Sequence, residues 1–317
     1  MARMYVEGWA PEYGAPFDPD EQLAPAEGEV DPTVERSAWE PLEGADDGGE
    51  RVAFVDGVRR VDARLLMDDP AAGPIPGICG TFAVGATLWH RTERRAEIRD
   101  VKVERWAVLA GGHADELPAV DLEPPYRSTT TPSEDPSHLV KELHTRMRRA
   151  EGELASALAA DAFVVADGPL NKPLAPLPVV GYVKTHRVTY LPTEQNAVIA
   201  ELAPGQRTPL FTIASDRPDV CRYSWYVRLA MLHGGHSWTG IVRCEASGRL
   251  AKDEVRTIAD RTAALLPVTG SEPHVDPRAP QNLVPIGALE RELRHRMGDP
   301  GLVYRALRHA VSDRAAS

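Results

Sequence analysis

Two short apolar runs in this chain each end in an aspartate followed by a glycine. The first run, RVAFVDG, ends at Asp56 and Gly57, and the second, AFVVADG, ends at Asp167 and Gly168. Two carboxylates held close together repel each other, and a divalent cation with oxygen ligands commonly relieves that repulsion. Each motif taken alone is also typical of an ordinary turn after a strand, so the chemistry depends on whether the two aspartates meet.

The segments between the aspartates predict how the two are placed. Apolar patterning predicts four strands, at 51–57, 59–67, 77–90 and 96–111. A loop at 124–137 and a helix at 138–160 follow them. A helix that crosses between two strands makes them parallel, so their carboxyl ends lie at one edge of the sheet. Ligands bind in α/β proteins at that edge. If the two strands are neighbours, Asp56 and Asp167 lie side by side.

The helix before the second aspartate offers a third carboxylate. Asp167 lies about 17 Å along its strand, and the helix covers that distance in about eleven residues, which leads back to a position near 148. Glu151 is the nearest carboxylate and lies at the edge of the apolar stripe, whereas Glu153 projects to the other flank and is the second choice. The alternative is that Glu151 is a surface residue paired with Arg148 or Arg149.

The rest of the chain continues the α/β pattern. Further strands are expected at 179–184, 209–214, 222–230 and 238–245, and helices are expected at 252–266, 285–297 and 300–310. No internal repeat with a solenoid period is present. The sequence therefore predicts a mixed sheet flanked by helices, with strand, meander, helix and strand in the ribonuclease H-like order.

Several strings resemble the NurA family of DNA repair nucleases. They are FVDGVRR, RRAEGELASALAADAFVVADGPL, VVGYVKTH, YSWYVRL and DPRAPQNLVPI, and together they cover roughly residues 50–310. The resemblance implies a ribonuclease H-like fold and DNA cleavage that depends on manganese (Mn²⁺) or magnesium (Mg²⁺), commonly 5′-to-3′. It also implies a homodimer that works with a HerA-type hexameric ATPase. Asp56, Glu151 and Asp167 match the family's acidic metal ligands, and Lys184 matches its lysine.

The chain departs from the family pattern near its C-terminus. The family carries a tyrosine and a histidine there that contribute to the site, and this sequence has Ala279 and Gly287 at those positions. The identity of the fourth ligand is therefore open. Asp276 immediately precedes the stretch and is our predicted fourth ligand, while Glu290, one helical turn beyond it, is the alternative.

A cluster of carboxylates that holds two divalent ions can hydrolyse a phosphodiester bond by in-line displacement. Asp56 is expected to bridge the ions, with Glu151 and Asp167 each completing one of them. Lys184, Arg187 and Arg228 are the candidate nucleic-acid contacts, because basic side chains neutralise phosphate oxygens. The aromatic residues of RYSWYVR at 222–228 offer stacking surfaces for bases, although aromatics that alternate in a strand are more often part of a core.

Charge divides the chain into two parts. The protein has 317 residues and a net charge of −11, while residues 1–50 alone carry fourteen acidic and two basic side chains, so the rest sums to +1. We therefore predict an acidic N-terminal arm at 1–50 and a nuclease domain at 51–317. The sequence contains no apolar run long enough to span a membrane and no signal peptide, so the cytoplasm is the expected location.

Two classes of function remain after the motifs are considered. No phosphate-binding loop and no Gly-x-Ser-x-Gly motif is present, which argues against nucleotide hydrolysis and acyl transfer. The first class is a metal-dependent nuclease. The second is a catalytically inactive ribonuclease H-like adaptor that binds DNA or an ATPase. The retained carboxylates favour the nuclease.

Overall fold

Three long antiparallel strands form the centre of this computed structural model, which describes residues 3–6, 29–46, 48–113, 115, 117–170, 176–184, 190–214, 221–232, 237–276 and 278–316. The strands are β4 (Arg51–Asp69), β5 (Gly73–His90) and β6 (Arg95–Leu109). Runs of β-branched and aromatic residues favour this extended structure. β4 and β5 pair along their whole length, which gives the sheet a rigid spine.

The first aspartate lies inside a strand and not at its end. We predicted separate strands at 51–57 and 59–67, and that prediction is wrong, because β4 continues through Gly57 to Asp69. Gly57 pairs with Val84 of β5 in the middle of the ladder. A shift of register between Val61 and Ala63 is the irregularity that β4 does contain.

A crossover helix connects the long strands to a parallel partner. Helix α2 spans Ser137–Leu158 and strand β8 spans Phe163–Asp167. β8 pairs with β4 in parallel, from Val52 opposite Phe163 to Val55 opposite Ala166. The predicted parallel arrangement is confirmed, and its register makes Asp56 and Asp167 the next pair. β9 (Val179–Val183) then adds in parallel to β8.

The described residues form a mixed sheet of 13 strands. Its central order is β6-β5-β4-β8-β9, which is the expected ribonuclease H-like order of a meander followed by a crossover. β7 (Tyr126–Thr130) pairs with β6, so part of the predicted loop at 124–137 is a strand. Beyond β9 the sheet continues with β13 (Ile241–Ser247), β12 (Arg222–Arg228) and β11 (Phe211–Ile213), and β10 (Gln206–Arg207) also pairs with β12.

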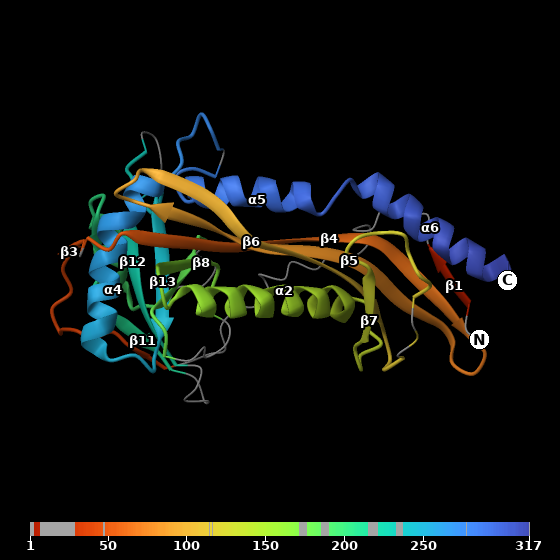
Figure 1. Ribbon diagram of the computed structural model, residues 1–317. Helices are drawn as coiled ribbons and strands as arrows, with labels where there is room; N and C mark the ends of the chain where they lie inside the picture. The colour runs from red at the N-terminus through yellow and green to blue at the C-terminus, as the bar shows by residue number, and fades with distance from the viewer. Residues whose placement is uncertain are drawn as a thin grey trace.

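Helices cover both faces of the sheet, with α2 on one side and α5 and α6 on the other (Figure 1). Alternate residues of β4 serve the two faces: Val55 packs with Ala155 of α2, and Val58 packs with Leu289 of α5. The helices other than α2 are α3 (Thr193–Glu201), α4 (Lys252–Leu265), the 3-10 turn η2 (Leu266–Thr269), α5 (Val284–Arg296) and α6 (Pro300–Ala316). Among the described residues, none of the helices has the length and hydropathy needed to cross a membrane.

The described parts of the N-terminal segment belong to the same sheet. β1 (Arg3–Val6) pairs with β4, β2 (Val30–Asp31) with β11, and β3 (Leu42–Glu43) with β10. Arg207 of β10 is buried and donates hydrogen bonds at 2.9 Å to Glu35. The boundary at residue 50 remains a prediction, since much of the acidic segment lies outside the described residues.

Candidate metal centre

Three carboxylates from distant parts of the chain meet where β8 ends beside the interior of β4. Asp56, Asp167 and Glu290 each place a carboxylate oxygen so that all three oxygens lie within 4.8 Å of one another. The parallel pairing of β4 and β8 brings the two aspartates together, as the topology predicted. Glu290 arrives from α5, which packs on the sheet face toward which Asp56 points. The arrangement matches the all-oxygen ligand sets that magnesium and manganese prefer.

Repulsion between the carboxylates of this cluster affects the pKa of Asp56. Burial raises the pKa of Asp56 well above its usual value, and the charges of Asp167 and Glu151 raise it further. Asp167 Oδ1 is buried and has no hydrogen-bond partner among the described residues. Buried carboxylate oxygens are normally hydrogen-bonded or bound to a cation. The cluster therefore fits a divalent metal ion.

Glu290 is held in place by two arginines. Its Oε2 accepts hydrogen bonds from Arg278 Nη2 at 3.0 Å and from Arg294 Nη1 at 3.2 Å. Burial raises the pKa of Glu290, but the hydrogen bonds and charge of Arg278, with the charges of Lys184 and Arg294, outweigh it and lower the pKa below its usual value. The side chain is thus ionised and oriented.

Asp276, the predicted fourth ligand, does not join the three carboxylates. Its Oδ2 accepts a hydrogen bond from Asn282 Nδ2 at 2.6 Å, and its Oδ1 accepts one from the backbone N–H of Arg278 at 2.8 Å. Asp276 therefore stabilises the turn before α5. The structure gives Glu290, the alternative considered above, the place next to the aspartates.

Glu151 lies beside the cluster, on the edge of helix α2. The carboxylate rests against the backbone of Gly57, so closely that a Cβ at position 57 would lie 2.4 Å from Glu151 Oε1. Glu151 is 4% exposed, whereas Glu153 is exposed and pairs with Arg149 at 2.9 Å. The helix geometry thus directs Glu151 toward the backbone of Gly57, next to Asp56 in the chain, and leaves Glu153 on the surface. Glu151 stays outside the group of three oxygens.

Arg148 connects helix α2 to the turn that follows β8. Its Nη1 donates to Glu151 Oε2 and to the carbonyl oxygen of Asp167, both at 2.7 Å, and its Nη2 donates to the carbonyl oxygen of Pro169 at 2.5 Å. One guanidinium therefore fixes a carboxylate and the backbone of the Asp-Gly-Pro turn together. From the sequence alone, Arg148 was expected only as an alternative surface partner of Glu151.

Lys184 reaches the centre from the end of β9. Its Nζ lies 2.7 Å from Asp167 Oδ2 and donates a hydrogen bond at 3.3 Å to Asn282 Oδ1. Burial lowers the pKa of Lys184, but the charge and hydrogen bond of Asp167, helped by Asp56 and Glu290, outweigh it and raise the pKa. Lys184 is therefore a fixed positive charge within the cluster.

Of the other two predicted nucleic-acid contacts, Arg187 and Arg228, the structure describes Arg228. Arg187 lies outside the described residues. Arg228 is 1% exposed, and its guanidinium donates to the carbonyl oxygens of Thr239, Ser237 and Ala200 at 2.7 to 3.0 Å. This placement gives Arg228 a role in holding local backbone. Trp225 and Tyr226 of the same strand are buried in the core, so they present no stacking surface.

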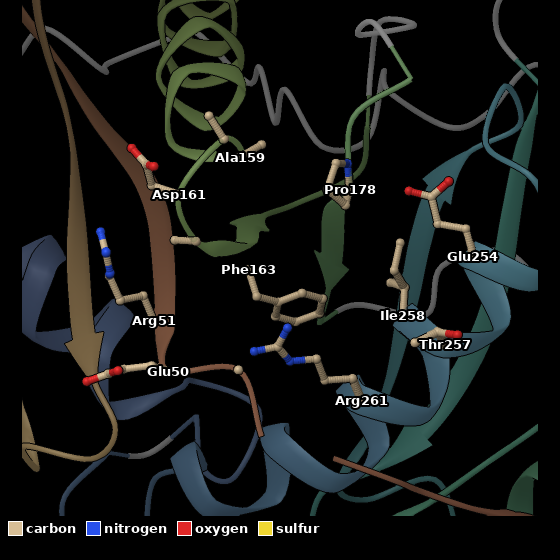
Figure 2. A pocket seen from close by; sticks show the side chains of 13 residues that line it. Glu50, Arg51, Ala159, Asp161, Phe163, Pro178, Glu254, Thr257, Ile258 and Arg261 are labelled. Atoms are coloured by element: carbon tan, nitrogen blue, oxygen red, sulfur yellow. The ribbon is translucent and has the colours of Figure 1, made fainter. Parts of the chain in front are cut away.

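A cavity of about 460 Å³ lies at the opposite, amino ends of the two parallel strands. Arg51 begins β4 and Phe163 begins β8, and both line the cavity together with Arg261, whose guanidinium lies 4.3 Å from the Phe163 ring centroid (Figure 2). Acidic side chains, including Asp161 and Glu254, lie on its walls as well. The cavity is separate from the carboxylate cluster, since none of Asp56, Asp167 and Glu290 lines it.

Comparisons with known proteins give a distant likeness. No family model and no curated protein matches the sequence. Among solved structures, the NurA nuclease from Sulfolobus solfataricus is similar over 82% of this chain and 86% of its own, with 10% identity and a TM-score of 0.44. The catalytic domain of human Endonuclease V is similar over 79% of this chain and 83% of its own, with 16% identity and a TM-score of 0.34.

Proposed function

We propose that this protein is a metal-dependent nuclease that hydrolyses phosphodiester bonds in DNA. The observation that carries the proposal is the convergence of Asp56, Asp167 and Glu290 from three separate elements, with oxygens within 4.8 Å. Such convergence is costly without a cation, because burial and like charges both oppose ionisation of Asp56. When bound, a divalent ion would supply an activated water and neutralise charge on the phosphate.

The chain's own residues have distinct roles in this proposal. Asp56, Asp167 and Glu290 would hold the manganese or magnesium ion, and Glu151 approaches from α2 beside Gly57, the residue after Asp56. Lys184 is held 2.7 Å from Asp167, where its charge would face a non-bridging oxygen of the phosphate. Arg148 is a positioning residue, since it acts on the site through Glu151 and the turn after Asp167.

The more specific parts of the proposed function are those that the resemblance of the sequence to the NurA family implies. They are 5′-to-3′ processing of DNA ends in repair or defence, a homodimer, a HerA-type ATPase partner and a cytoplasmic location. Manganese is the metal to test first. Gel filtration and co-purification with a candidate ATPase examine the assembly separately from the chemistry.

A second candidate function is an inactive adaptor that binds DNA or an ATPase. The observation in its favour is the loss of the family's tyrosine and histidine, at Ala279 and Gly287. A Cβ at Gly287 would lie 3.1 Å from Asn282 Nδ2, so a side chain at this position would point toward the residues around Lys184. The adaptor function predicts that the protein binds DNA or an ATPase but shows no metal-dependent cleavage of DNA.

The test is degradation of end-labelled DNA with manganese, magnesium or a chelator. Asp167→Asn and Glu151→Gln should each slow cleavage by about a hundredfold or more, since several kcal/mol of transition-state stabilisation is lost. Glu153→Gln is the matched control, because Glu153 lies on the same helix and is exposed. Cleavage by Asp167→Asn at the wild-type rate excludes the proposed centre, and absence of metal-dependent cleavage by wild type favours the adaptor.

A further inference from the structure

The last two helices, α5 and α6, carry the same five-residue pattern of basic residues around a leucine. Arginine, any residue, leucine, arginine and histidine occur in this order at 291–295 and again at 305–309. The central leucines, Leu293 and Leu307, are fully buried. The flanking basic residues are exposed, and we call them the basic strip: Arg291, Arg294, His295, Arg305, Arg308 and His309.

Helical spacing places each set of basic residues on one side of its helix. Positions separated by three and four residues are neighbours on a helix surface, so Arg291 lies next to Arg294 and His295, and the same spacing holds in α6. Figure 1 shows α5 and α6 following one another along the sheet face opposite α2. Because both central leucines point inward, the basic sets of both helices point outward from that face.

The strip is strongly positive in a protein whose net charge is −11. Beside its four arginines lie Arg296, which pairs with Glu292 at 2.7 Å, and Asp299, whose carboxylate accepts a hydrogen bond from the backbone N–H of Leu302. These nearby acidic groups are thus engaged locally. Arginine presents a planar fork of donors that suits phosphate oxygens.

The strip begins at the carboxylate cluster. Arg294 Nη1 lies 3.2 Å from Glu290 Oε2, and Glu290 is one of the three converging carboxylates. From Arg291 to His309 the two helices extend for about 25 Å, at about 1.5 Å per residue with a bend between the helices. At about 3.4 Å per base pair this length corresponds to roughly seven base pairs of duplex.

We propose that the basic strip binds the phosphate backbone of duplex DNA and leads its end to the carboxylate cluster. Binding to a single strand without sequence preference uses exposed aromatic side chains on which bases stack. Within the described side chains of α5 and α6, the exposed large apolar residues are Val284 and Leu302, neither of which is aromatic. The inference rests on the proposed nuclease function and adds the surface and the form of DNA.

The test uses Arg305→Gln with Arg308→Gln, which leaves Glu290 and its arginines intact. Binding of a labelled duplex of about 16 base pairs, roughly twice the length of the strip, is measured by fluorescence anisotropy with a chelator present, over a series of salt concentrations. Each lost phosphate contact lowers the salt slope by about one, so the double variant should have a slope smaller by about two and bind more weakly.

The matched control is Arg249→Gln with Arg256→Gln, which makes the same charge change at exposed positions at and before α4. This control should bind the duplex like wild type. An unchanged slope in the strip variant, or a loss confined to a single strand of the same length, overturns the proposed duplex path. In that case wild type still cuts DNA; if wild type neither binds nor cuts DNA, the proposed function itself fails.

Discussion

The three carboxylates of the candidate metal centre differ in the charges that surround them. Asp167 lies 2.7 Å from a lysine nitrogen, and Glu290 lies 3.0 Å from an arginine nitrogen. Asp56 is buried among acidic groups, and burial together with Asp167 and Glu151 raises its pKa. Asp56 is therefore the position at which a bound cation would relieve the most repulsion.

Asp276 and Glu290 should differ in their effect on manganese binding. Glu290→Gln should weaken manganese binding by roughly tenfold or more, since even partners of metal ligands are worth about that much. Asp276→Asn should leave manganese affinity near the wild-type value, because the Asp276 carboxylate is bound to Asn282 and to the backbone of Arg278. Isothermal titration with manganese measures both variants. Equal weakening by the two substitutions would contradict the assignment of Glu290.

The sequence alone does not decide whether Asp276 or Glu290 is the fourth ligand. Asp276 adjoins the stretch that resembles the nuclease family, whereas its side-chain partners depend on a turn whose folding no periodic pattern records. Glu290 follows Leu289 and precedes Leu293, so the apolar spacing of α5 places it near the buried side of that helix. This spacing indicates that Glu290 is buried. That Glu290 meets the two aspartates depends on how α5 packs on β4, which the spacing does not record.

At the scale of elements, the two Asp-Gly pairs have different structural roles. Gly168 adopts a φ of 87°, a conformation that L-residues rarely adopt, and it turns the chain after β8. Gly57 lies within β4 and permits the close approach of helix α2 and its Glu151. The sequence predicted a turn at both glycines, since the dipeptide is the same and the difference lies in a contact 94 residues away.

The close approach at Gly57 predicts the effect of adding one methyl group. In Gly57→Ala the Cβ would lie 2.4 Å from Glu151 Oε1 and 3.0 Å from Met147 Cγ. The carboxylate of Glu151 must then move, so metal-dependent cleavage should fall, and overpacking should cost about 1–3 kcal/mol of unfolding free energy. Chemical denaturation of the variant measures that cost.

A second substitution separates this contact from general strain in the strand. In a Glu151→Ala background, Gly57→Ala should cost measurably less, because the atom it meets first has been removed. Gly270→Ala is the matched control, since a Cβ there meets its nearest atom at 3.4 Å. The same cost for Gly57→Ala in both backgrounds would show that Glu151 is not the obstructing group.

At the scale of the whole molecule, the crossover topology is the feature that the sequence predicts best. The apolar spacing predicts the crossover helix, which makes β8 parallel to β4, and the pairing of Val55 with Ala166 then places the two aspartates side by side. The short strands β2, β3 and β10 and the helix α3 were not predicted. They are two to nine residues long, too short for a periodic signal, and they form by packing against the larger elements.

Packing of helix α2 against the sheet also buries a titratable group that the proposed chemistry does not use. Neither ring nitrogen of His144 has a hydrogen-bond partner among the described residues. Burial, together with the positive charges of Arg59 and Arg148, lowers the pKa of His144 from 6.5 to about 4. The folded protein therefore keeps His144 neutral at pH values where an unfolded chain would protonate it.

This difference predicts that His144 makes the protein less stable in mild acid. The pKa is lower in the folded state, so the contribution of His144 is fully favourable above about pH 6.5 and is lost as the pH falls toward about 4. Between about pH 7 and pH 5 the loss should be about 1–2 kcal/mol of unfolding free energy. His144→Gln cannot take up this proton, so its melting temperature should fall less over the same range, measured with a chelator present. His274→Gln, at an exposed position, is the control and should follow wild type. If His144→Gln and wild type lose stability in parallel, the acid sensitivity arises from other groups.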